Sequence, residues 1–367
     1  MRGSCFVLLV LLLAGSVSTA SAQARWRLQE IVRIGGADEG LASFNQIGDL
    51  QIDADGKVWV LDFQTQSLRL FAADGAPIKE AARRGRGPGE LARANGVRIG
   101  PDGRMYVRDY SNARIAVYGA DGATLTSHMV MASGYGYLWD GGVDGQQRVV
   151  ERTTVRRGEE FTTVILRRSP DFQSADTTEV PARCAIPTER KGSIQGKSGF
   201  VSVPFAPRLL MKFGRTGATW CGSTDEYRVR RFAFGAVTAD VEVTRTVPRV
   251  PIAKAERDAA IARVDSFLVR IGGPVDPWKP SEVARDRGPM VAFETDDQDR
   301  LWVLRELPSG QMEFDVWDTR GKHIASLPSP LKYDFIPLFR IHGDRVAMMM
   351  LDEDDLPTIV VSRIVRP

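Results

Sequence analysis

The sequence predicts groups of short apolar strands, and four oxygen-bearing side chains lie in or near the first strand of their group. They are Asp49, Asn95, Asp140 and Glu294. Carboxylate and amide oxygens are the ligands that calcium prefers, and the ion needs six to eight of them converging on one point. Convergence would indicate a calcium-dependent hydrolase, whereas divergence would leave polar lining in a water-filled channel. Because their spacing matches no known calcium motif, no metal ligand or catalytic residue is assigned.

Aromatic side chains alternate at Tyr135, Tyr137 and Trp139. Alternation with a period of two places all three on one face of a strand. Such a face could bind a sugar or a peptide, because aromatic rings offer a broad apolar surface. The alternative is packing between neighbouring sheets. These three aromatics, together with Asp49 and Asn95, are candidate binding residues.

A Gly-rich segment, Gly85–Glu90, carries Arg86 and follows two further arginines. Arg86 could face an anionic ligand and is therefore a sixth candidate binding residue. The segment departs from the G-x-G-x-x-G pattern, and no helix follows it to bind a phosphate at its N-terminus. The pattern is more typical of a linker between two structural repeats.

The elements that would position these residues are repeated along the chain. The stretch Ile47–Leu91 occurs again 47 residues later, with Asp55-Gly56 matching Asp102-Gly103 and Asp62 matching Asp109. Within each repeat, Asp-Gly turns separate short runs rich in Val, Ile, Leu and aromatic residues. The order predicts four antiparallel strands in roughly 45 residues, which is the size of one β-propeller blade.

The repeat resembles the NHL-type propellers. The stretch Asp109–Tyr118 reads DYSNARIAVY and carries the Asp, Asn, Arg and apolar-x-apolar pattern of that family. The first repeat departs from it, with Thr65 in place of the Asn and Ser67 in place of the Arg. Residues 85–91 also resemble a linker of exported bacterial six-bladed propellers. The resemblance implies a fold far more than an activity, since propellers host unrelated functions.

Some NHL-like lyases hold a metal through histidines, and gluconolactonase-like and paraoxonase-like propellers hold a central calcium ion through acidic and Asn side chains. Here His128 and His323 are predicted on outermost strands and His342 near an innermost one. Side chains on such different radii cannot share one ion at the ~2.0–2.1 Å that zinc requires. We therefore expect no histidine metal site, and calcium stays the one possible cofactor.

Polar residues that recur from repeat to repeat favour a structural role. Asp62 and Asp109 occupy equivalent positions, and Asn112 and Arg114 follow the second of them. A recurring group more often satisfies turn amides or joins adjacent blades than performs catalysis.

The whole chain is predicted to be all-β: a six-bladed β-propeller at residues 23–367 with one inserted helix at about 253–272. The helix is indicated by apolar residues at helical spacing from Ile261 to Ile271, followed by Gly272. Residues 25–34 read as a strand without a hairpin partner, so they are predicted to complete the last blade beside residues 358–364. Residues 182–203 read as a long loop.

The first 22 residues have the form of a signal peptide, with a basic start, an apolar core and Ala20-Ser21-Ala22 as the cleavage site. They predict a secreted or periplasmic protein, and no later segment is apolar for long enough to span a membrane. Two cysteines remain, Cys184 and Cys221. They could form a disulfide in an oxidising compartment or remain two buried thiols.

The charges nearly balance, with 49 basic and 46 acidic residues among 367. This balance is not that of a dedicated nucleic-acid or membrane-surface binder. The sequence therefore favours an exported binding scaffold for a peptide, a glycan or a protein partner and leans away from an enzyme. The alternative is a calcium-dependent hydrolase or lactonase with its ion on the axis.

Overall fold

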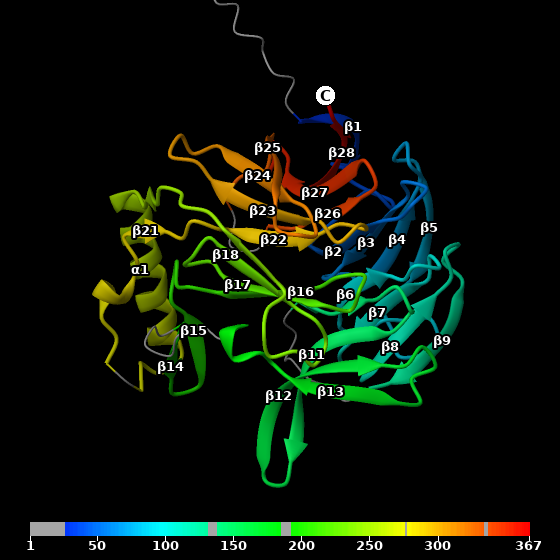
Figure 1. The fold of residues 1–367 in the computed structure, drawn as a ribbon, viewed down its shortest axis with the longest axis horizontal. Helices are drawn as coiled ribbons and strands as arrows, with labels where there is room; N and C mark the ends of the chain where they lie inside the picture. The colour runs from blue at the N-terminus through cyan, green and yellow to red at the C-terminus, as the bar shows by residue number, and fades with distance from the viewer. Residues whose placement is uncertain (1–25, 131–137, 185–191, 276, 334–336) are drawn as a thin grey trace, which may run out of the picture.

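The computed structural model describes residues 26–130, 138–184, 192–275, 277–333 and 337–367. Six four-stranded antiparallel sheets surround a central axis and form a six-bladed β-propeller (Figure 1). The predicted fold is therefore confirmed. The candidates Tyr135 and Tyr137 lie outside the described residues.

The first three blades follow one another along the chain. Blade one consists of β2 (Ile47–Ile52), β3 (Val58–Asp62), β4 (Ser67–Phe71) and β5 (Pro77–Ala82). Blade two consists of β6 (Ala94–Ile99), β7 (Met105–Asp109), β8 (Arg114–Tyr118) and β9 (Thr124–Met129). Blade three consists of β10 (Gly142–Val143), β11 (Val149–Arg157), β12 (Glu160–Arg168) and β13 (Ala175–Glu179).

The remaining blades continue the same order from the axis outward. Blade four consists of β16 (Leu209–Phe213), β17 (Thr219–Ser223), β18 (Arg228–Phe232) and β19 (Val241–Thr244). Blade five consists of β22 (Ala292–Thr295), β23 (Leu301–Glu306), β24 (Met312–Trp317) and β25 (His323–Ser329). Blade six consists of β26 (Phe339–His342), β27 (Arg345–Leu351), β28 (Pro357–Val365) and β1 (Arg27–Gly35).

The middle strands are buried because each blade packs against a neighbour on both faces. Every residue of β3 and β7 is buried. Trp59, Trp220 and Trp302 occupy equivalent places on the second strands of three blades, and each is 0% exposed. The Asp-Gly turns work as predicted, since Gly56 and Gly103 adopt φ values of +81° and +80° that other residues rarely adopt.

The N-terminal strand closes the ring, as predicted. β1 pairs antiparallel with β28 from Arg27↔Val365 to Gly35↔Thr358. Figure 1 shows these two strands side by side at the top of the view. Closure gives the inner strands of the first and last blades fixed neighbours, so the axis is surrounded on all sides.

The inserted helix α1 spans Lys254–Arg270. Gly272 follows its C-cap residue, Ile271, with a φ of +84°. Its buried residues Val264 and Leu268 pack with Ile194 and Val203. A short pair, β20 (Val250–Pro251) and β21 (Asp286–Arg287), brackets the insert, which also contains the 3₁₀ turn Pro280–Glu282.

The prediction of a loop over residues 182–203 is wrong in part. The segment contains a 3₁₀ turn, Ala182–Cys184, and the hairpin β14 (Ser193–Gly196)–β15 (Gly199–Ser202), which packs on α1. Four-residue strands with glycines give too weak an alternation to be recognised from the sequence. A hydrophobic partner elsewhere in the chain, the helix, stabilises them.

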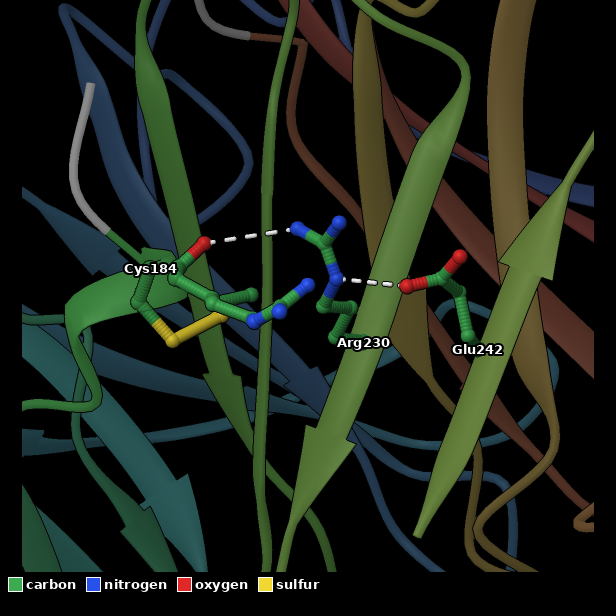
Figure 2. Close-up of a disulfide and its surroundings, with 5 residues drawn as sticks. Cys184, Arg230 and Glu242 are labelled. Atoms are coloured by element: carbon green, nitrogen blue, oxygen red, sulfur yellow. Dashed lines mark hydrogen bonds and ion pairs between the residues drawn. A yellow bond between two sulfur atoms is a disulfide. The ribbon is translucent and has the colours of Figure 1, made fainter. Parts of the chain in front are cut away.

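Cys184 and Cys221 form a disulfide with their Cα atoms 5.5 Å apart, so the alternative of two free thiols is wrong. Figure 2 shows the bond beside Arg230, whose guanidinium donates to the Arg183 carbonyl at 3.5 Å and to Glu242 at 2.6 Å. The bond attaches the 3₁₀ turn to β17 of blade four. None of the described helices is long and apolar enough to cross a membrane.

Candidate functional site in the central channel

Each blade brings one charged residue to the channel from its innermost strand or from the residues just before it. Their signs alternate around the axis: Asp49, Arg98, Asp140, Lys212, Glu294 and Arg340. We call this set the charged ring. Three negative and three positive side chains make its formal charge zero.

Direct contacts connect most of the charged ring. Asp49 receives Arg98 and Arg340, one on each carboxylate oxygen, both at 2.5 Å. Arg340 also donates to Glu294 at 2.8 Å, and Glu294 forms an ion pair with Lys212. Arg98 donates to two carbonyls beside blade three, those of Trp139 and Gly141.

Asp49 is fully buried and strongly stabilised as an anion. Burial alone would raise the pKa of its carboxyl, but Arg340 and Arg98 outweigh burial and the pKa is lowered. The backbone N–H of Val97 also donates to it at 3.0 Å. Burial lowers the pKa of Lys212, and the Glu294 carboxylate only partly offsets that effect.

The arrangement bears on the calcium hypothesis. The structure brings Asp49 and Glu294 together, but on the guanidinium of Arg340, which lies between them and binds both. Asn95 and Asp140 instead line a separate cavity. Among the described residues, no group of three His, Cys, Asp or Glu side chains is arranged to hold a metal ion.

The cavity that contains Asn95 and Asp140 lies between blades two and three, beside the start of their innermost strands. It measures about 250 Å³, and we call it the mouth cavity. Its polar lining includes Asn95, Arg108, Asp140, Glu151 and Arg152 together with Thr153, Thr154 and Thr163, while Leu138 and Trp139 form an apolar part of the wall.

The mouth cavity exists because blade three has the shortest innermost strand. β10 has two residues, whereas the innermost strands of the other blades have four to six. β10 pairs with β11 at Gly142↔Val150 and Val143↔Val149. The next residues of β11, from Glu151 to Thr154, therefore border the cavity.

The charged groups of the mouth cavity are arranged in pairs. Arg152 contacts Asp140 at 3.0 Å, and Arg108 lies 3.8 Å from Glu151. Glu151 is 2% exposed and accepts a hydrogen bond from the indole N–H of Trp139 at 3.0 Å. Burial raises the pKa of Asp140, although Arg152 and Lys212 act in the opposite direction.

A smaller cavity of about 100 Å³ lies within the channel. Four members of the charged ring line it, Arg98, Lys212, Glu294 and Arg340. The final residues of the innermost strands, including Ile52, Ile99, Phe213 and His342, complete the lining. His128 and His323 lie on the outermost strands β9 and β25, as predicted.

The other predicted residues have structural surroundings. Arg86 is exposed in the linker between blades one and two, where Glu90 accepts from the Gly87 amide and Arg114 donates to the Gly87 carbonyl. Trp139 is 5% exposed, so it is part of the cavity wall and not an open aromatic face.

The recurring carboxylates Asp62 and Asp109 accept hydrogen bonds from turn amides. Asp62 receives the N–H groups of Gln64 and Thr65, and Asp109 receives that of Arg93. Their structural role is therefore confirmed.

Sequence reasoning missed six charged residues of the channel and the mouth cavity: Arg98, Arg108, Glu151, Arg152, Lys212 and Arg340. It searched for oxygen ligands and so ignored the basic partners. A usable signal was present, because each innermost strand except β10 carries a single acidic, lysine or arginine side chain within an apolar stretch. A charge at a buried strand position requires a partner, and alternating signs supply one.

No protein-family model matches the chain, and no curated protein matches it either. Solved structures share the fold at low identity. A member of the DUF4221 family from Bacteroides vulgatus superposes with a TM-score of 0.57 at 9% identity, covering 94% of this chain and 99% of that one. A candidate exported protein from Bacteroides fragilis gives 0.53 at 11% identity, with 95% and 98% covered.

Regucalcin, a calcium-binding protein from Agrobacterium tumefaciens, gives a TM-score of 0.43 at 15% identity, covering 92% of this chain and 95% of that one. That superposition is too loose to support an argument about this chain. The comparisons define the class as β-propeller and leave the activity to the geometry of the channel.

Proposed function

We propose that the protein is an exported binding propeller that receives a peptide, glycan or protein-borne group in the mouth cavity. One observation carries the proposal: Glu151 and Arg108, each 2% exposed, border a cavity between blades two and three. Burying charges beside empty space costs stability that a packed apolar wall would not cost. Buried ionisable groups in the wall of a cavity are typical of binding and catalytic sites.

Export is supported by two features. The chain starts with a segment that has the pattern of a signal peptide. Cys184 and Cys221 form a disulfide. Disulfides form and persist in oxidising compartments such as the periplasm or the cell exterior.

The geometry gives the calcium-dependent lactonase little support. An ion on the axis would need Asp49 and Glu294 as ligands, and both already bind arginine or lysine. We expect the thermal midpoint of the mature protein to be unchanged by excess EDTA and by calcium added afterwards. A calcium-reversible fall of several degrees would favour the lactonase, because an ion bound only to the native state stabilises it.

The binding proposal is tested by a thermal-shift screen of short peptides and glycans on the mature chain. A ligand of the mouth cavity raises the midpoint of the wild type and loses that effect in Thr154→Trp, which fills the cavity. The matched control is Thr177→Trp, an exposed position on β13 of the same blade. Hits that respond equally in both variants bind elsewhere and contradict the proposal.

A further inference from the structure

We infer that the ligand of the mouth cavity is a neutral, hydroxyl-rich group, a single saccharide ring. The inference rests on the proposed function and adds the chemical class of the ligand. Charge, hydrogen-bonding groups and size support it independently.

The charges of the mouth cavity cancel within the wall. Arg152 is paired with Asp140 at 3.0 Å, and Arg108 faces Glu151 at 3.8 Å. The four charged groups of the wall sum to zero, and Arg168 donates to the other Glu151 oxygen at 3.3 Å from outside the lining. Each wall carboxylate is therefore already paired with arginine, and a charged ligand would have to compete with these pairs. Each wall charge can still donate or accept hydrogen bonds, and bonds to charged groups are the stronger ones.

The hydrogen-bonding groups suit a ligand with several hydroxyls. Thr154 and Thr163 lie opposite each other on β11 and β12, so their side chains share one face of the hairpin. A threonine hydroxyl both donates and accepts, and the amide of Asn95 supplies both functions as well. A hydroxyl group on a ligand also does both, so it can pair with every member of this set.

The cavity, of about 250 Å³, is large enough for one sugar ring. Leu138 and Trp139 provide apolar wall for the carbon-bound hydrogens on the faces of a sugar ring, while the polar groups reach its edge. The cavity therefore has the mixed character that an amphipathic ring requires.

The test uses ligand-observed NMR on the mature protein with three matched probes: glucose, glucuronate and glucosamine. Glucuronate adds a negative charge to a similar ring, and glucosamine adds a positive one. For the wild type we expect glucose to bind with a dissociation constant of about millimolar and the charged probes to bind roughly tenfold more weakly.

Two variants each remove one charge from the wall and leave net charges of opposite sign. Asp140→Asn leaves Arg152 without its partner, so glucuronate should then bind about tenfold better than to the wild type and glucose should bind less well. Arg152→Gln leaves Asp140 without its partner and should favour glucosamine in the same way. The control Asp176→Asn removes a surface partner of Arg167, a 2.9 Å pair on the same blade, and should change nothing.

Two outcomes would overturn the inference. In the first, no neutral sugar, including galactose and N-acetylglucosamine, binds the wild type. In the second, Asp140→Asn binds glucuronate no better than the wild type does. If peptides nevertheless stabilise the wild type and not Thr154→Trp, the saccharide inference fails while the proposed function holds. If no probe distinguishes Thr154→Trp from Thr177→Trp, both fail.

Discussion

Two carboxylates of the charged ring, Asp49 and Asp140, have the same chemistry and opposite surroundings. Asp49 is 0% exposed and contacts two arginines at 2.5 Å, whereas 25% of the Asp140 side chain is exposed and its close contact is Arg152 at 3.0 Å. Their pKa values move in opposite directions from the same reference. The difference separates a carboxylate that maintains the structure from one that borders a site.

The largest expected effect on the free energy of unfolding is that of Asp49→Asn. Asp49→Asn keeps the shape of the side chain but removes the carboxylate that Arg98 and Arg340 share. Removing one partner of a buried ion pair costs about 3–5 kcal/mol. Urea unfolding should show a loss of this size, and a loss below about 1 kcal/mol would contradict a structural role for the ring.

The coupling between Asp49 and Arg340 gives the next largest effect. A double-mutant cycle with Asp49→Asn and Arg340→Met should give a coupling energy of about 1–3 kcal/mol, because the residues are in direct contact. The matched cycle is Asp176→Asn with Arg167→Met on the surface of blade three, where about 0–1 kcal/mol is expected. Equal coupling energies in the two cycles would show that burial does not strengthen the ion pair between Asp49 and Arg340.

The pH dependence of stability should separate the two carboxylates by sign. The lowered pKa of Asp49 gives stability that is present above pH 3.8 and is lost as pH falls through the folded pKa. The raised pKa of Asp140 gives stability that is present below pH 3.8 and is lost as pH rises through its folded pKa. A tenfold difference in acid dissociation constant between the folded and unfolded chain corresponds to about 1.4 kcal/mol of unfolding free energy.

Urea titrations of the wild type, Asp49→Asn and Asp140→Asn between about pH 3 and pH 7 would measure both contributions. The stability of Asp140→Asn relative to the wild type should improve as pH rises, and that of Asp49→Asn should worsen. Curves that move in the same direction would contradict the distinction between the two carboxylates.

The smallest effect is expected from Asp140→Asn near neutral pH. Its burial disfavours the charge and its ion pair with Arg152 favours it, so the change in unfolding free energy should stay within about 1 kcal/mol. Thermal and urea unfolding would measure it. A loss as large as that of Asp49→Asn would mean that Asp140 belongs to the structural part of the ring.

The fold could be predicted from the sequence because the information was local and repeated. Asp55-Gly56 and Asp102-Gly103 marked turns at a fixed period, and the apolar stretches between them could only be buried strands. The strand at residues 25–34 was recognisable because it had no neighbouring partner. The hairpin β14–β15 was not, since its stability comes from α1, about 60 residues further along the chain.

The site was less predictable because it depends on contacts between blades. Asp49 and Asn95 were recognised as polar residues near the axis, but the sequence does not show that Arg340, almost 300 residues away, binds Asp49. The mouth cavity depends on the shortness of β10. No pattern in the sequence shows that this strand stops pairing after two residues. The contact between Glu151 and Trp139 also required the structure.

The closure of blade six also determines when the ring can form during synthesis. β1 is synthesised long before its partner β28, so the ring cannot close until β28 has been made. At ~5–20 residues per second this takes on the order of tens of seconds. During that time β1 has no partner strand and is open to other chains. A truncation that removes β28 would prolong this state indefinitely, and aggregation of nascent chains would be its first sign.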